Sequence, residues 1–344
     1  MKKKAYRDNA PPILLEYLHY LSVIKGRAEN TVLSYYEDLK LFFRFLNERM
    51  GVEGGFENDD IRHITDAVVE SVTLMDAMEF LHFMNDRGNN AASRSRRAIA
   101  LRRFYKYLAD TKRWYEVSPL DKLTLPSAKR ALPKYLTLEQ SKSLLNIPNA
   151  ANTFEEARAF CMLTLFLNCG MRLSELVSIN TNDVRRSSAD SDNIAEFLVI
   201  RGKGSKERSV YLNKACAEAI ENYIEHRTKL SETHEKLLSE QALFVSERRC
   251  QRLSPRRVQQ IVEESLAHSG LSGNGISVHK LRHTAATLMY QNGVDVLVLK
   301  DVLGHENLGT TQIYTHVADK RVKEAMKQNP LSGESVPGED NNKK

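Results

Sequence analysis

The chain has 344 residues, which is enough for two domains, and a modest net charge of +6 at pH 7. It has no apolar run long enough to span a membrane, and polar residues follow the basic residues 1–4 where a secretion signal would have an apolar core. These features exclude a membrane-spanning protein and favour a cytoplasmic one with reduced cysteines. No Cys/His cluster has zinc-ligand spacing, so we expect no metal and no cofactor.

The first half of the sequence is predicted to be helical. Apolar residues recur at steps of three and four over residues 13–24, and a second such run, which Asn30 or Thr31 can cap, continues to Leu46. Further runs cover residues 74–84 and 93–108. The apolar sides of these helices should pack on one another.

Charge is unevenly distributed over these helices. Residues 53–80 are acidic, whereas residues 94–113 are basic. The arginines expected to face a partner are Arg94, Arg96, Arg97, Arg102 and Arg103. A focused basic stretch is typical of a protein that binds the phosphate backbone of a nucleic acid, although a solvated helix face has the same composition.

A linker and a second domain follow. Pro119, Pro126 and Pro133 punctuate a polar and basic stretch, and Thr137 with Gln140 fits a capping box that opens a new helix. We therefore expect a helical domain over residues 1–125, a linker over 126–135, a second domain over 136–327 and a disordered tail over 328–344.

The second domain should be mainly helical with a small β-sheet. A largely apolar helix is predicted over residues 155–169, ending at Gly170. After a polar loop over residues 187–193, two strands are predicted over 197–200 and 208–212, on either side of a glycine-rich turn.

Two arginines, two histidines and one tyrosine in this domain, with a glutamate near the first arginine, form a pattern that points to chemistry. Arg172 lies three residues before Glu175, His279 lies three residues before Arg282, and His305 lies nine residues before Tyr314. Taken alone, Arg172 and Glu175 are most simply a surface ion pair, and Tyr314 is most simply a packed aromatic residue. The spacing of His279 and Arg282 is also a weak signal by itself. Their combination indicates a site in which a phenolic oxygen attacks a phosphodiester.

The surrounding sequence resembles the tyrosine recombinase (phage integrase) family, and within it the Xer-type recombinases. The resemblance covers residues 11–325, and it is strongest in five segments: 170–176, 201–208, 279–284, 303–305 and 311–316. It implies a mainly helical, two-domain clamp around DNA. A SAM-like helical core-binding domain would precede a tyrosine recombinase catalytic domain.

The resemblance also implies roles for individual residues. Tyr314 would be the nucleophile, although a phenol with a pKa of about 10 needs help at neutral pH. Arg172 and Arg282 would stabilise charge on the non-bridging phosphate oxygens, and Glu175 would orient an arginine or a histidine.

The remaining site residues leave two choices open. His279 and His305 would donate to the phosphate, and either of them could be the base that accepts the tyrosine proton. His283, beside Arg282, is the less favoured alternative to His279. Lys203 is favoured over Lys206 as the general acid for the leaving 5′ oxygen, and Lys206 would contact DNA.

The implied function is site-specific recombination through a 3′-phosphotyrosine intermediate. The enzyme would act as a tetramer on double-stranded DNA with a specific recombination site, alone or with a paralogous recombinase, in the cytoplasm at the nucleoid. Its role would be Xer-like dimer resolution in chromosome partition, or integration and excision of a mobile element. The alternatives are relaxation of DNA like a type IB topoisomerase, or a non-catalytic architectural role on DNA.

Overall fold

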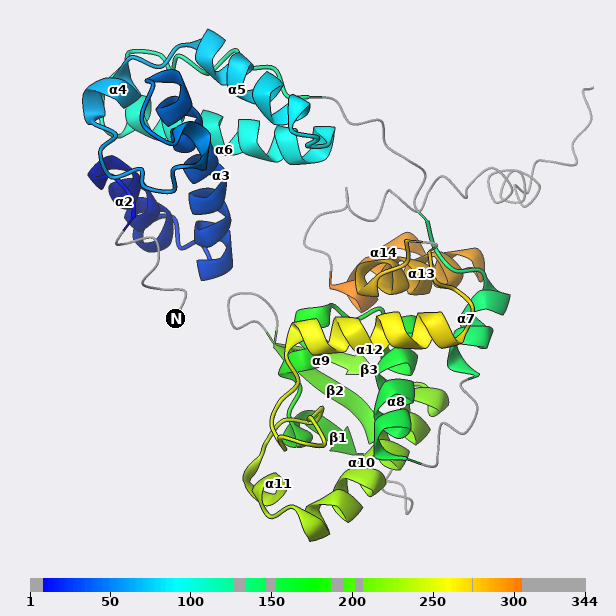
Figure 1. The fold of residues 1–344 in the computed structure, drawn as a ribbon. Helices are drawn as coiled ribbons and strands as arrows, with labels where there is room; N and C mark the ends of the chain where they lie inside the picture. Colours follow the sequence, from blue (N-terminus) through cyan, green and yellow to red (C-terminus); the bar gives the residue numbers. More distant parts are fainter. Residues whose placement is uncertain are drawn as a thin grey trace, which may run out of the picture. The chain divides into compact units, whose positions relative to one another are not determined.

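The computed structural model describes residues 9–126, 134–146, 153–186, 195–201, 207–273 and 275–304, with the backbone alone for Arg201. The chain divides into two compact units, Met1–Ala131 and Leu132–Lys344. Figure 1 shows helices throughout both units and one small sheet, which lies in the second unit. The predicted fold class, mainly helical with a small sheet in the second domain, is confirmed.

The N-terminal unit is built from helices around an aromatic core. Its elements are α2 (Pro12–His19), η1 (Tyr20–Ile24), α3 (Glu29–Arg49), η2 (Gly55–Glu57), α4 (Asp66–Glu70), α5 (Leu74–Asp86) and α6 (Ala91–Asp110). Phe42 packs edge to face on Phe80, and Tyr17 packs in the same way on Phe104. All four rings are almost completely buried, so α2, α3, α5 and α6 share one core.

Two details of this unit differ from the sequence prediction. The cap predicted at Asn30 or Thr31 is wrong, because α3 begins at Glu29 and its N-cap residue is Ala28, which offers no side-chain acceptor. The acidic side chain of Glu29 instead lies in the first turn, where it suits the positive end of the helix dipole. The five-residue helix α4 was not predicted.

The C-terminal unit is organised around the buried helix α8. Its elements are α7 (Leu138–Leu145), α8 (Phe154–Cys169), α9 (Leu173–Ser178), η3 (Thr181–Asp183), β1 (Val184–Arg186), β2 (Ala195–Arg201), β3 (Glu207–Tyr211), α10 (Lys214–Thr233), α11 (Lys236–Ser239), α12 (Pro255–His268), α13 (Val278–Gln291) and α14 (Val296–Leu303). Helix α8 packs against α7, α10, α12 and α13. The capping box of Thr137 and Gln140 at the start of α7 is confirmed.

The sheet has three antiparallel strands in the order β1-β2-β3. The predicted pair is present as β2 and β3, with Leu198 opposite Val210 and Ile200 opposite Arg208. Strand β1, which pairs with β2 through Val184 and Leu198, was not predicted. The turn between β2 and β3 and the polar loop predicted over residues 187–193 lie outside the described residues.

All four cysteines are buried and free. Among the helices that the structure describes, none is both long enough and apolar enough to cross a membrane.

Candidate active site

The ends of two helices meet at the candidate site. Gly170 follows α8 with φ of 60° and Gly304 follows α14 with φ of 64°, both in the left-handed region that favours glycine. A Cβ atom on Gly170 would lie 2.6 Å from Cδ2 of Leu303, and one on Gly304 would lie 2.8 Å from Nε of Arg208. Both glycines are therefore needed for backbone conformation and for close packing.

Arg172 and Glu175 are joined at the start of α9. Arg172 is the N-cap residue of α9, and Glu175 lies in the first turn of that helix. Its main-chain N–H donates to Oε2 of Glu175 at 2.7 Å, and its Nη1 donates to Oε1 at 2.6 Å. The glutamate thus holds both the backbone and the guanidinium of Arg172.

Arg282 reaches the same place from α13. Its Nη1 donates to the main-chain oxygen of Gly170 and its Nη2 to that of Leu303, each at 2.6 Å. Nη1 also lies 3.9 Å from Oε2 of Glu175. Arg172 and Arg282, the two arginines predicted to bind the phosphate, therefore both lie beside the buried carboxylate of Glu175.

Sequence reasoning gave no role to Arg208, which the structure adds to this group. Arg208 lies on β3, and its Nη2 lies 3.2 Å from Oε2 of Glu175. The residue ends the stretch 201–208 on which the family resemblance rests, and that was the available signal.

Positive charge exceeds negative charge in these contacts. Three guanidiniums, from Arg172, Arg208 and Arg282, lie around the carboxylate of Glu175. Burial alone would raise the pKa of Glu175, but the hydrogen bond from the Arg172 backbone and the arginine charges outweigh it and lower that pKa. An ionised carboxylate with surplus arginines suits an anionic ligand. Among the described residues, no group of three His, Cys, Asp or Glu side chains is placed to hold a metal ion.

The structure distinguishes the two neighbouring histidines of α13. His279 lies exposed in the first turn of the helix. His283 is half-buried with its ring edge-on to Tyr135, and burial, followed by the charge of His279, lowers its pKa. His283 therefore has a packing role, which favours His279 as the site histidine. Four further predicted site residues, Lys203, Lys206, His305 and Tyr314, lie outside the described residues.

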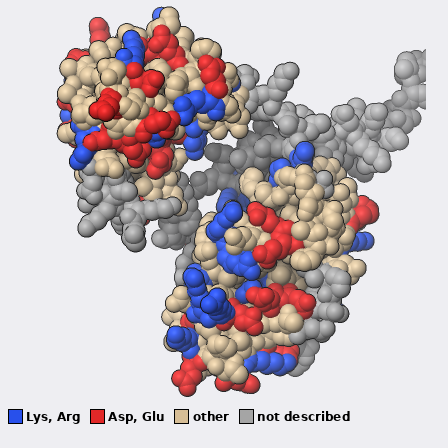
Figure 2. Space-filling model, viewed as in Figure 1, with Lys and Arg blue, Asp and Glu red and all other residues tan. Residues whose placement is uncertain are grey.

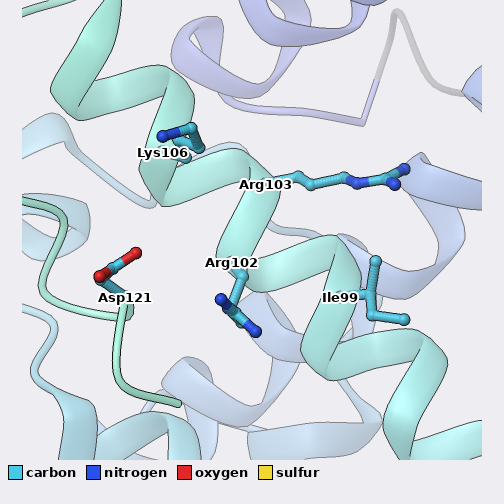
Figure 3. Close-up of a pocket in the computed structure, with 5 residues that line it drawn as sticks. All are labelled: Ile99, Arg102, Arg103, Lys106 and Asp121. Carbon is cyan, nitrogen blue, oxygen red and sulfur yellow. The ribbon is translucent and has the colours of Figure 1, made fainter. Parts of the chain in front are cut away.

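The basic residues of α6 fall into two groups. Arg102, Arg103 and Lys106 line a shallow pocket with Ile99 and Asp121 (Figure 3). Arg103 is exposed and also donates to the Tyr35 hydroxyl. This part of α6 presents the positive charge that the sequence predicted.

The other arginines of α6 lie nearer its start. The expectation that they all face away from the core is wrong for Arg97, which is 8% exposed and donates to Asn89 at 2.9 Å. Arg96 is bonded to the buried Asp38 at 2.8 Å but remains half exposed, and Arg94 is partly buried.

Sequence reasoning also missed a basic surface on the C-terminal unit, here called the arginine loop. It consists of the exposed side chains of Arg248, Arg249, Arg252 and Arg256. An isolated antiparallel β-bridge joins Val245 to Arg252 across the loop, and the chain then continues into α12. Figure 2 shows Lys and Arg side chains gathered on one side of this unit. Residues 248–257 are rich in arginine, and this composition could have predicted the basic surface.

Comparison with known proteins defines the class. The sequence model of the phage integrase family matches residues 134–321, and that of the phage integrase N-terminal SAM-like domain matches residues 14–67. Tyrosine recombinase XerC of Caldanaerobacter subterraneus subsp. tengcongensis is 44% identical, covering 94% of this chain and 88% of the relative. Tyrosine recombinase XerD of Caulobacter vibrioides is 31% identical, covering 89% of this chain and 92% of the relative.

A solved structure supports the same fold. The XerH site-specific recombinase bound to a palindromic difH substrate, in a post-cleavage complex, matches with a TM-score of 0.66 and 20% identity. The match covers 92% of this chain and 94% of that chain.

Fold, arginine cluster and relatives together define an enzyme that cleaves DNA and exchanges its strands. The chain belongs to the phage integrase family and is a site-specific tyrosine recombinase. The predicted family and enzyme class are confirmed. The comparisons give no support to the topoisomerase-like or architectural alternatives.

Proposed function

We propose that Tyr314 attacks a DNA phosphodiester to form a 3′-phosphotyrosine, while Arg172 and Arg282 bind the non-bridging oxygens. The observation that carries this proposal is the convergence of both guanidiniums on Glu175 and on the end of α14. Arginine stays charged at any working pH and can form two parallel hydrogen bonds to a phosphate. Groups held in place before the reaction stabilise the developing charge without further reorganisation.

The remaining roles concern protons. His279 and His305 would donate to the phosphate and accept the tyrosine proton. Lys203 would protonate the departing 5′ oxygen, and Lys206 would contact the DNA backbone. The covalent intermediate keeps the energy of the broken bond, so the strand can be rejoined without ATP.

The DNA interface would involve both units. We assign residues 1–125 to DNA binding, 126–135 to a linker and 136–327 to catalysis. Arg103 and Lys106 on α6, and Arg248, Arg249 and Arg256 in the arginine loop, are exposed cations that suit phosphate contacts, which fix the position of a protein on DNA. The buried Arg97 would support α6 from within and would not touch DNA.

The assembly would be a tetramer on two duplexes that carry a specific site, formed by this chain alone or with a paralogous recombinase. It would work in the cytoplasm at the nucleoid. Resolution of chromosome dimers fits the relative named XerC, and movement of an integrative element uses the same chemistry.

Covalent trapping tests the proposal. Nicked DNA that releases a short fragment after cleavage should leave the protein attached to a 3′ end, visible on a denaturing gel. Genomic DNA captured in this way and sequenced would give the target site, and thus the biological role. Strand cleavage without attached protein would contradict the proposed chemistry. Relaxation of supercoils without recombinant products would favour the topoisomerase-like alternative.

A further inference from the structure

Arg208 links two parts of the site that are distant in the sequence. From β3, its Nη1 donates to the main-chain oxygen of Val302 at 2.8 Å, and its Nη2 donates to Oε2 of Glu175 at 3.2 Å. Its side chain is 21% exposed, and its Nε is the atom that a Cβ on Gly304 would meet. The residue is therefore packed tightly against both α9 and the end of α14.

Three arginines hold three consecutive carbonyls at the end of α14. Arg208 bonds the main-chain oxygen of Val302, Arg282 that of Leu303, and Arg172 that of Gly304 at 2.8 Å. Carbonyls at a helix C-terminus lack partners within the helix and carry its negative partial charge. The arginines satisfy them, and in return the carbonyls fix the directions of the guanidiniums.

We propose that Arg208 is a positioning residue for strand cleavage. It holds Glu175 and the end of α14 in the arrangement that aims Arg172 and Arg282 at the scissile phosphate. The proposal rests on the phosphate-binding role of those two arginines given under the proposed function. Arg208 acts through these neighbours, because its two hydrogen bonds join Glu175 to the main chain of α14.

Loss of Arg208 should disturb chemistry more than binding. Glu175 would lose one of its cationic partners. The end of α14 would lose one of the three arginine hydrogen bonds to its main-chain oxygens. A displacement of reacting groups by about 1 Å can slow a reaction by about 10²-fold. DNA affinity depends mostly on phosphate contacts elsewhere on the protein, so it should change little.

The test compares Arg208→Met with a matched variant, Arg227→Met. Arg227, on α10, also bonds two main-chain oxygens, those of Glu240 at 2.7 Å and Ala242 at 3.2 Å. Among the described residues it forms no hydrogen bond or ion pair with Glu175 or with α14. Both variants should unfold at a lower temperature than the wild type. At saturating protein, only Arg208→Met should slow single-turnover cleavage, by about 10²-fold.

Two further variants separate a positioning role from a structural one. Arg208→Lys keeps the charge and one donor, so it should recover part of the cleavage rate and remain informative if Arg208→Met fails to fold. Combining Arg208→Met with Glu175→Gln should slow cleavage far less than the product of the two single effects, because both act through one network.

Several outcomes would overturn the assignment. Equal cleavage rates for Arg208→Met and Arg227→Met would reduce Arg208 to a structural residue. A salt slope lower by about one unit for Arg208→Met would make it a direct phosphate ligand. Rescue of Arg208→Met by a sulfur at the bridging 5′ position would place its action on the leaving group. If the wild type itself forms no adduct, the proposed function fails, and the role of Arg208 fails with it.

Discussion

Arg172 donates to Glu175 twice, through its main-chain N–H at 2.7 Å and through Nη1 at 2.6 Å. The first bond satisfies one of the free N–H groups at the start of α9, and the second orients the guanidinium. One buried carboxylate thus sets both the fold at this point and the direction of a phosphate-binding side chain. The stability of the protein should therefore depend on the charge of Glu175.

Replacing Glu175 should make the stability less sensitive to acid. The folded pKa of Glu175 lies below its ordinary value of 4.5, so the carboxylate stabilises the fold fully above about pH 4.5 and loses this effect as the pH falls through the folded pKa. Glu175→Gln should cost about 3–5 kcal/mol of unfolding free energy at pH 7. Urea denaturation measures the unfolding free energy of both proteins from pH 7 down to pH 4. The difference between wild type and Glu175→Gln should become smaller only at the acid end of this range.

Glu225→Gln is the matched control for this change. Glu225 pairs with Lys229 on the surface of α10, and that contact lowers its pKa, yet an exposed pair contributes little. The role given to the carboxylate would be contradicted if the difference in unfolding free energy between wild type and Glu175→Gln stayed constant from neutral to acid pH.

The arginines of α6 should divide into DNA-binding and structural residues. Arg102 lines the exposed pocket, and among the described residues it forms no hydrogen bond or ion pair. Arg102→Gln should leave stability unchanged, weaken DNA binding and lower the salt slope by about one unit. Arg97→Gln should instead destabilise the protein by about 1–3 kcal/mol, because it removes a buried partner of Asn89 and Asp38.

Salt-dependent binding curves and thermal unfolding of both variants provide the measurement. A reduced salt slope for Arg97→Gln, with no loss of stability, would show that this side chain reaches DNA after all.

Apolar periodicity predicted the long elements, since α5, α6 and α8 each bury one face or more over at least three turns. It missed β1 and α4, whose three and five residues are too short to show a period. The burial of Arg97 was not predictable from its own helix, because its ionic partner Asp38 lies on α3. Arg208 was missed for the same reason, since its partners come from α9 and α14.

Removing the proposed nucleophile should separate binding from cleavage. Tyr314→Phe deletes one oxygen, so the variant should bind its DNA site with normal affinity and form no covalent adduct. Gel shift and denaturing gels on the same nicked substrate measure the two properties side by side. An adduct trapped with this variant would exclude Tyr314 as the attacking residue.

The roles of Lys203 and Lys206, which lie between β2 and β3 in the sequence, can be assigned with a sulfur-substituted substrate. The departing 5′ oxygen is strongly basic and needs a proton, whereas a sulfur at that bridging position leaves without one. Lys203→Ala should therefore cleave ordinary DNA very slowly, yet cleave a 5′-bridging phosphorothioate nearly as fast as the wild type.

Arg172→Ala is the control, and sulfur should not rescue it, because its guanidinium stabilises charge on the non-bridging oxygens. Lys206→Ala should keep its cleavage of ordinary DNA if Lys206 contacts only the backbone. Rates of adduct formation on the two substrates, measured in single turnover for all three variants, decide the assignment. Sulfur rescue of Lys206→Ala and not of Lys203→Ala would make Lys206 the general acid.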